Sequence, residues 1–186
     1  IVQRGLIPLI AVPHAAIALG LAFLIAPSGW IIRSLSFLVM GWETPPEWVT
    51  LQDPFGLSLI FGLVLKETPY LLLMILAALP QIRAQEYLRI GQSLGYGNFR
   101  SWLKLVLPQV YPLIRLPVFA VLAFSLSVVD VALILGPTTP PTLAVLILRW
   151  IDDPDLSFRF LASAGAVLLL VITLGSLFFW RVSEWL

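Results

Sequence analysis

Four long apolar stretches dominate the chain, and each is long enough to cross a membrane as a helix. They run over residues 6–27, 55–79, 106–135 and 160–182. About 20 apolar residues are needed to cross the hydrocarbon core of a bilayer. Unpaired backbone groups are too costly in lipid, and no alternating ten-residue strand pattern occurs, so the stretches are predicted to be helical. The pattern therefore predicts an all-α, polytopic transmembrane helix bundle with four spans.

Composition supports a membrane protein and removes several kinds of chemistry. The chain is 60% hydrophobic and 11% charged, with a mean hydropathy of +0.99, whereas soluble domains are about 25% charged. It has no cysteine and a single histidine, which argues against disulfides, thiol nucleophiles and metal sites. We therefore predict no metal and no cofactor, and a net charge of +1 gives no reason to expect nucleic acid as a partner. The chain begins without Met or a signal-peptide pattern, so we expect a fragment of a longer polypeptide.

Basic residues are concentrated between the second and third stretches. Residues 80–115 carry five Lys or Arg against Glu86 alone, whereas residues 27–54 and 136–159 hold more acidic than basic side chains. Basic loops stay in the cytoplasm. This predicts a cytoplasmic loop between the second and third spans, two outer loops, and both ends of the fragment in the cytoplasm. Tryptophans in residues 30–42 and 143–150 are expected to lie along the outer interface.

Among the charged residues inside the predicted spans are Lys66, Glu67 and Asp130. At about 1.5 Å of rise per residue, Lys66 lies roughly 25 Å from Arg83 and Asp130 roughly 22 Å from Arg115. Charged side chains in spans usually face the interior and find partners. We hypothesise that Lys66 or Glu67 approaches Asp130, or that they flank one translocation pathway. The alternative is that Lys66 extends outward to the interface, or that the second helix starts after it.

Prolines interrupt three of the four stretches, and His14 follows one of them. Proline removes a backbone hydrogen bond and bends a helix, which a membrane protein tolerates where protein or water satisfies the freed groups. Such breaks are typical either of simple packing kinks or of a bundle that opens and closes. His14 either donates to a neighbouring carbonyl or serves as a ligand in the pathway. The prolines concerned are Pro8, Pro13, Pro69, Pro108, Pro112 and Pro117.

A polar segment, residues 86–108, separates the second and third spans. Its first part favours a short helix with Tyr87, Ile90, Gly91 and Leu94 on one face. Gly91 and Gly95 are four residues apart, which would bare a strip of backbone on that helix.

Glycines then end this helix and a second amphipathic helix leads into the third span. Gly95 and Gly97 can adopt a positive φ and stop the first helix. After the turn, apolar residues recur at helical spacing. The short helix is either a docking element for a cytosolic partner or a membrane-surface helix without one. The apolar positions of the second helix are Phe99, Trp102, Leu103 and Val106.

The sequence LGYGNFRSWLKLVLP, residues 94–108, resembles the signature loop of the permeases of bacterial ATP-binding cassette (ABC) importers. That signature reads Glu-Ala-Ala, three residues, Gly, about nine variable residues, then Ile-x-Leu-Pro. Gly95 falls on the signature glycine, and Leu107 and Pro108 fall on the closing pair. Leu105 takes the place of the Ile, and Phe99 falls on the usual aromatic position.

Two further stretches resemble the spans of iron, thiamine and sulfate-type permeases. They are VPHAAIALGLAFL, similar to the third span, and SVVDVALILGP, similar to the fifth. The chain departs from the signature where Arg89, Ile90 and Gly91 stand at the Glu-Ala-Ala positions, so the acidic residue is missing. Glu86, one helical turn earlier, is a possible substitute.

The resemblance implies a single importer transmembrane domain over residues 1–186, truncated at its N-terminus and holding the last four of six spans. It implies a coupling loop, residues 83–108, that docks on a cytoplasmic ABC ATPase. Further implied partners are a periplasmic or lipid-anchored solute-binding protein and a second permease, identical or different, in the bacterial inner membrane. The ATPase-coupling positions would be Glu86, Arg89, Gly91, Leu94, Gly95, Phe99, Leu107 and Pro108.

The resemblance implies a non-catalytic subunit, to which there are two alternatives. The chain lacks the Gly-rich loop followed by Lys-Ser/Thr that holds ATP phosphates, in keeping with a separate ATPase. The main alternative is an ion-coupled secondary transporter with Lys66, Glu67 and Asp130 as its relay. An intramembrane enzyme is disfavoured, because the chain has one histidine, no cysteine and no paired carboxylates in one span.

Overall fold

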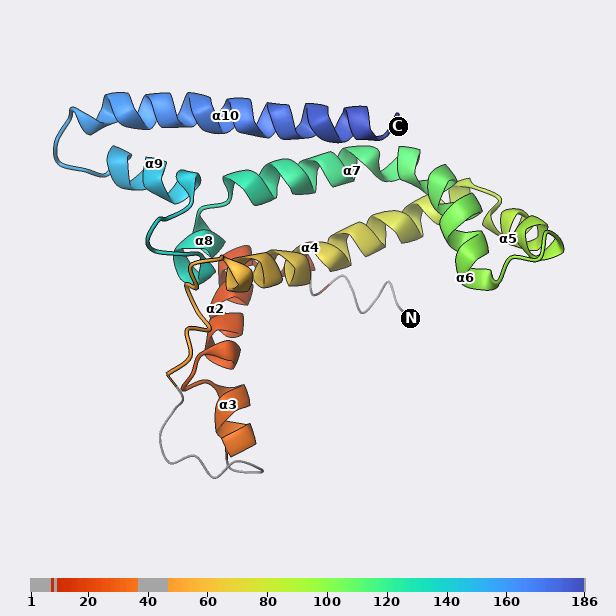
Figure 1. Cartoon of the computed structure of the whole chain (residues 1–186), viewed down its shortest axis with the longest axis horizontal. Helices are drawn as coiled ribbons and strands as arrows, with labels where there is room; N and C mark the ends of the chain where they lie inside the picture. Colours follow the sequence, from red (N-terminus) through yellow and green to blue (C-terminus); the bar gives the residue numbers. More distant parts are fainter. Residues whose placement is uncertain (1–7, 9, 37–46, 186) are drawn as a thin grey trace. The chain divides into compact units, whose positions relative to one another are not determined.

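The computed structural model describes residues 8, 10–36 and 47–185, and apart from one isolated bridge the regular structure within them is helical (Figure 1). The chain divides into two compact units, which are described separately. Unit 1 comprises Ile1–Ala11 and Glu67–Leu122, and unit 2 comprises Val12–Lys66 and Ala123–Leu186. Helices α4 and α7 contribute residues to both units. The elements are α2 (His14–Ile25), α3 (Trp30–Leu35), α4 (Leu57–Ala78), η2 (Leu79–Gln81), α5 (Ala84–Ser93), α6 (Asn98–Ser101), η3 (Trp102–Val106), α7 (Leu107–Ser127), α8 (Asp130–Leu135), α9 (Leu143–Ile151) and α10 (Phe158–Ser183).

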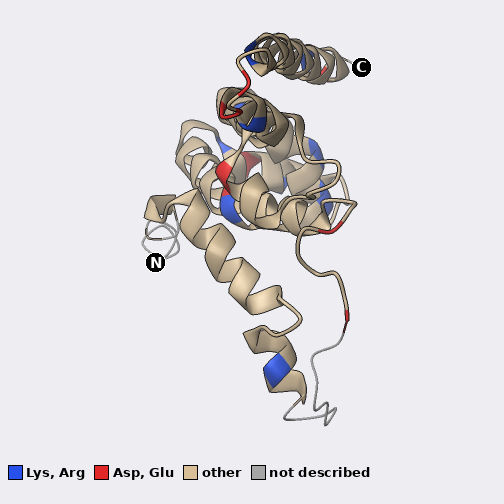
Figure 2. Cartoon of the chain, turned by 90° about the vertical axis from the view of Figure 1, so that its left-hand side faces the viewer, with Lys and Arg blue, Asp and Glu red and all other residues tan. Residues whose placement is uncertain are grey.

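Four helical stretches in the described residues are long and apolar enough to cross a membrane, as the sequence predicts. They are His14–Leu35, Leu57–Gln81, Asn98–Ser127 and Phe158–Ser183. Uncharged residues make up most of the ribbon in Figure 2. Large apolar side chains on these helices face outward, as Phe160 does with 82% of its surface exposed. Such surfaces suit contact with lipid or with other membrane helices rather than with water. The prediction of an all-α, polytopic fold is confirmed.

The third predicted span is wrong at its C-terminal end. We predicted one helix over residues 106–135, but α7 ends at Ser127 and α8 begins at Asp130. The Ser127 hydroxyl donates back to the Ala123 carbonyl at 2.9 Å, and two β-branched valines follow. These features weaken α7 at its end. Asp130 follows, and an acidic residue in the first turn favours the start of a new helix. The depth of Asp130, calculated along an unbroken helix, therefore does not apply.

The first predicted span, over residues 6–27, is interrupted inside its length. Pro13 precedes α2, has a ψ of 145° and so stands outside the helix. Proline lacks the N–H that a continuous helix needs and disfavours helical geometry in the residue before it. The N-terminal part of this prediction, residues 1–7 and 9, lies outside the described residues. The two stretches predicted to be outer loops contain the helices α3 and α9. Residues 37–46 of the first of these stretches also lie outside the described residues.

The core of unit 2 joins α2 to α8. Ala18 and Leu21 of α2 are buried with Val131 and Leu135 of α8, and part-buried residues of α4, such as Leu63, cover them. Helix α9 packs against α10 in the same unit. The short α8 is thus held by apolar contacts on one side, while its first residue, Asp130, stays exposed.

Asp53 fixes the start of α4 in unit 2. Its carboxylate is buried and accepts hydrogen bonds from the Leu57 amide at 2.8 Å and from the Ser58 amide at 2.9 Å. The Ser58 hydroxyl also contacts Asp53 at 2.8 Å and the Leu135 carbonyl at 2.7 Å, which ties α4 to the end of α8. Burial raises the pKa of Asp53, but the hydrogen bonds from Ser58 and Leu57 outweigh it and hold the pKa below its ordinary value.

Asp53→Ala is expected to destabilise the protein by about 1–2 kcal/mol at pH 7, because a capping carboxylate is lost. Since the folded-state pKa is lowered, the stabilisation is present above the unfolded value of about 3.9 and is lost as pH falls through the lower folded value. Urea unfolding of the purified protein in micelles at pH 7 and pH 3 measures this, with the exposed Asp152→Ala as the matched control. A deficit of Asp53→Ala that is the same size at both pH values would contradict it.

Unit 1 has its own core where α4 ends and α7 begins. Ala78, Val106, Val110 and Ile114 are buried there. Part-buried residues of α5, Tyr87 and Leu88 among them, pack against this cluster. The core therefore fixes the coupling loop on the ends of two membrane-length helices.

Candidate functional site

The first half of the coupling loop is the helix that the sequence predicts. Helix α5 covers Ala84–Ser93 and has a strongly amphipathic pattern. Glu86, in its first turn, pairs with Arg83 at 3.5 Å, and both side chains are largely exposed. An exposed pair of this kind stabilises a helix only slightly. Arg89, which stands at the acidic position of the signature, is also exposed.

Gly91 faces inward, which corrects the prediction that it bares backbone to a partner. A Cβ atom added at Gly91 would lie 2.3 Å from Ser101 Oγ and 2.6 Å from Ser101 Cβ. Ser101 has no exposed surface, and Leu105 would also lie only 3.1 Å away. A glycine is needed because α5 and α6 approach here too closely for any side chain, and Figure 1 shows these two helices side by side. The strip of backbone is thus covered by the loop itself.

Gly95 ends α5 in the way that the sequence predicts. Its φ is +81°, in the left-handed region that favours glycine. The Gly95 amide donates to the Gln92 carbonyl at 3.0 Å, and the Tyr96 amide donates to the Gly91 carbonyl at 2.9 Å. These two bonds form a Schellman motif, which satisfies the last carbonyls of the helix. Gly97, also predicted to have a positive φ, instead has a φ of −68° and precedes α6.

The second half of the loop runs directly into the third span. Helix α6, the π-helical turn η3 and α7 follow one another without a gap and form the candidate span Asn98–Ser127. Pro108 explains the wider turn before it, because a proline ring clashes with the carbonyl four residues earlier, here that of Lys104. Leu107, part-buried, and Pro108, exposed, both lie in the first turn of α7.

Several large apolar side chains of the coupling loop are exposed. Leu94 and Phe99 expose 65% and 76% of their surfaces, and Ile90 exposes 50%. We call Ile90, Leu94 and Phe99 the exposed apolar surface. The sequence predicts four residues on one face of the first helix of the loop. Two of them, Ile90 and Leu94, belong to this surface, whereas Tyr87 is part-buried toward the core. Exposed apolar side chains within an otherwise polar segment favour contact with another apolar surface.

Lys66 is buried at the proline break of the first span. Its Nζ donates to the Val12 carbonyl at 2.6 Å, and only 7% of the residue is exposed. Pro13 interrupts the helix directly after Val12, so the carbonyl that Lys66 binds is one that the break leaves without its helical donor. Of the two alternatives, the lysine points into the protein rather than outward. Its part in a translocation pathway stays a prediction.

The other pathway candidates lie in different surroundings. His14, the first residue of α2, contacts Phe124 of α7 with ring centroids 4.5 Å apart. Glu67 is part-buried on α4, and Asp130 is exposed in the first turn of α8. The structure therefore brings Lys66 and His14 to the same proline break. The approach of Asp130 to Lys66 or Glu67 stays a prediction, without the depth argument that suggested it.

Two residues that position these sites were missed from the sequence. Ser101 looks like an ordinary polar residue of an amphipathic helix, and only the three-dimensional contact with Gly91 reveals its burial. Asp53 is one of the acidic residues in the predicted outer loop 27–54, although an Asp four residues before an apolar helix is a capping signal. Among the described residues, no group of three or more His, Cys, Asp or Glu could hold a metal ion.

Comparison with known proteins bears on the family of the chain. Over 177 residues, 93% of its length, it is 34% identical to the inner membrane ABC transporter permease protein YnjC of Escherichia coli (strain K12). The chain is a homologue of ABC transporter permeases. The four membrane-length apolar helices in the described residues agree with this homology and make the chain a membrane protein with several spans. The chain spans about a third, 33%, of the length of this relative. No family model matches it.

Proposed function

We propose that this permease chain is part of an ABC importer, which moves a small solute across the inner membrane with energy from ATP hydrolysis on a separate subunit. The observation that carries the proposal is the coupling loop. Its Gly95 and Leu107-Pro108 spacing resembles the importer signature, and the homologous relative is an ABC transporter permease. In this proposal the loop is cytoplasmic, as its basic residues suggest, and both ends of the chain are on the same side.

The exposed apolar surface is the proposed contact with the ATPase. Ile90, Leu94 and Phe99 are exposed, whereas Tyr87, Leu88 and Val106 of the same loop pack into the core. Glu86 and Arg89 are exposed on the same helix and supply charge at the edge of the contact. An apolar centre with a charged rim is the usual arrangement of a protein interface. Because Arg89 replaces the acidic signature residue, we expect the matching ATPase to present an acidic or neutral group at this position.

Movement of α5 would reach the membrane through two rigid connections. The contact of Gly91 with Ser101 locks α5 onto α6, and α6 continues through η3 into α7. The core around Val106 and Val110 joins the same region to the end of α4. A shift of the ATPase would therefore be transmitted to two candidate spans at once, which suits an alternating-access cycle.

The remaining partners follow from the general organisation of such importers. A second permease would complete the pathway, and a solute-binding protein would deliver solute on the side opposite the coupling loop. Lys66 and His14, at the proline break of the first span, would lie beside the pathway. Lys66 also donates a hydrogen bond to the Val12 carbonyl. The same charged group would therefore stabilise the break in the first span and lie beside the pathway.

Reconstitution of the whole transporter in proteoliposomes tests the energy source. Uptake of the solute bound by the associated binding protein is expected to require ATP on the side of the ATPase and to persist when an uncoupler removes the proton gradient. An ATPase with its phosphate-binding lysine replaced is the control and should give no uptake. Uptake that the uncoupler abolishes and that continues without ATP would instead support the ion-coupled alternative with its Lys66, Glu67 and Asp130 relay.

A further inference from the structure

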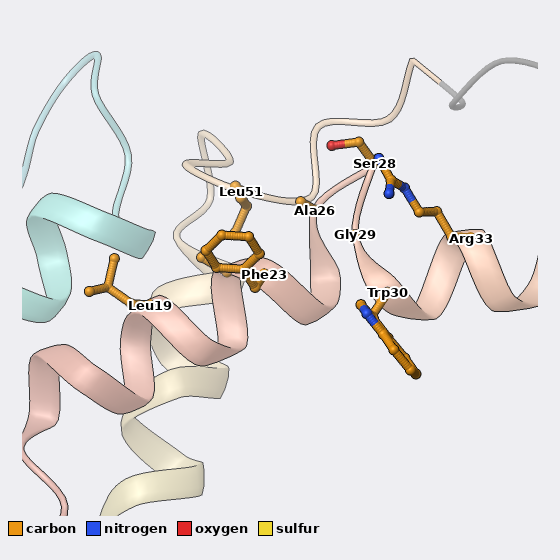
Figure 3. Close-up of a pocket in the computed structure, with 9 residues that line it drawn as sticks. Leu19, Phe23, Ala26, Ser28, Gly29, Trp30, Arg33 and Leu51 are labelled. Atoms are coloured by element: carbon orange, nitrogen blue, oxygen red, sulfur yellow. The ribbon is translucent and has the colours of Figure 1, made fainter.

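A pocket of about 560 Å³ lies where α2 turns into α3 in unit 2. Figure 3 shows the residues that line it. They come from α2, the turn after it, α3 and the non-helical segment before α4. One end is apolar and the other is polar. The residues that carry the argument are Leu19, Phe23, Leu51, Ser28, Trp30 and Arg33.

The apolar end has the character of a surface for a hydrocarbon chain. Leu19 and Phe23 expose 52% and 78% of their surfaces although they belong to a helix without a charged residue. Leu51, from the chain before α4, also lines the pocket (Figure 3). Because α2 belongs to a candidate membrane span, lipid would be available to this wall. An acyl chain is the most abundant apolar group at that place.

The polar end offers donors of the kind that bind phosphate. Arg33 is exposed, and Figure 3 shows its side chain extending from α3 toward the turn that carries Ser28. A guanidinium and a hydroxyl match the acceptor oxygens of a phosphate. None of the described residues that line the pocket is acidic, so the site is positively charged. Trp30 exposes 74% of its surface, and an exposed tryptophan beside an arginine is typical of the level of lipid headgroups.

We propose that this pocket binds an anionic phospholipid. The phosphate would accept hydrogen bonds from Arg33 and Ser28, and one acyl chain would lie along Leu19, Phe23 and Leu51. The negative charge of the headgroup complements the arginine, and the acyl chain covers the apolar wall. The site rests on the membrane location of the chain and does not depend on the direction or energy source of transport.

Tryptophan quenching tests the site in the whole transporter, reconstituted in nanodiscs that contain phosphatidylcholine and a minor fraction of brominated lipid. The signal of Trp30 is isolated by subtracting the Trp30→Phe variant. Brominated phosphatidylglycerol is expected to quench Trp30 more strongly than brominated phosphatidylcholine at the same fraction. Arg33→Gln should reduce this preference about fivefold, the effect of one basic residue at a membrane surface, whereas Arg33→Lys should keep most of it.

Arg149→Gln is the matched control, because Arg149 is also exposed beside a tryptophan on a short helix but lies outside the pocket. It should leave the preference unchanged. Equal quenching by the two lipids, or an equal loss in Arg33→Gln and Arg149→Gln, would overturn the proposal. The absence of quenching by either lipid would also overturn it, because a protein partner would then cover the pocket. If Arg33→Gln fails to fold, Ser28→Ala replaces it, and an unchanged preference in that variant counts against the site.

Discussion

Replacing Gly91 with valine is expected to abolish coupling between ATP hydrolysis and transport. The nearest atoms to a Cβ at this position, Ser101 Oγ and Cβ, would lie at 2.3 and 2.6 Å, well inside contact distance. Ser101 is fully buried, so it cannot turn away, and α5 has to separate from α6. We expect uptake to fall by at least tenfold, because the loop can no longer pass a shift of α5 to α7. Uptake and ATPase activity, measured together in proteoliposomes, show whether hydrolysis continues without transport.

The same contact supplies a rescue and a control. Removing the Ser101 side chain makes space, so Gly91→Ala combined with Ser101→Gly should recover much of the activity that Gly91→Ala loses alone. Such recovery would show that the two residues act through one contact. Gly97→Ala is the matched control, because a Cβ there meets no atom within 4 Å and its backbone has a negative φ. Normal coupled uptake by Gly91→Val would show that the close approach of α5 and α6 has no role in coupling.

The sequence predicts the spans well, because a long apolar run leaves few alternatives in a membrane. The helices α4 and α10 begin and end within about three residues of the predicted stretches. The break before Asp130 could not be predicted from hydropathy, since Val128 and Val129 continue the apolar pattern there. The break depends on a local competition, in which Ser127 bonds back to Ala123 and α8 finds its own packing on α2.

Spacing predicts the order of the coupling loop but not which face of α5 is covered. The helix, the glycine turn at Gly95 and the helix into the span all follow from the residues. Helical periodicity places Tyr87, Ile90, Gly91 and Leu94 together, yet the core divides them, with Gly91 and Tyr87 turned inward and the other two outward. That division depends on Ser101, which meets α5 only after the chain has turned back.

The exposed apolar surface leads to the second large effect. Leu94→Asp places a charge at the centre of the proposed contact with the ATPase, where it would be buried without a partner. We expect at least a tenfold loss of docking, because truncation or charging of a central interface residue commonly costs more than about 1.4 kcal/mol. Leu94 is 65% exposed and contributes little to the core, so the permease chain itself should fold as before.

The amount of ATPase that stays bound to the detergent-solubilised transporter is the most direct test of the coupling loop. The unmodified chain, Leu94→Asp and Leu156→Asp are each co-expressed with a tagged ABC ATPase subunit and purified through the permease. Leu156 is the matched control, because it is 62% exposed in the loop between α9 and α10. The coupling-loop account predicts normal ATPase binding for the unmodified chain and Leu156→Asp and at least a tenfold loss for Leu94→Asp. Equal binding by all three would contradict it.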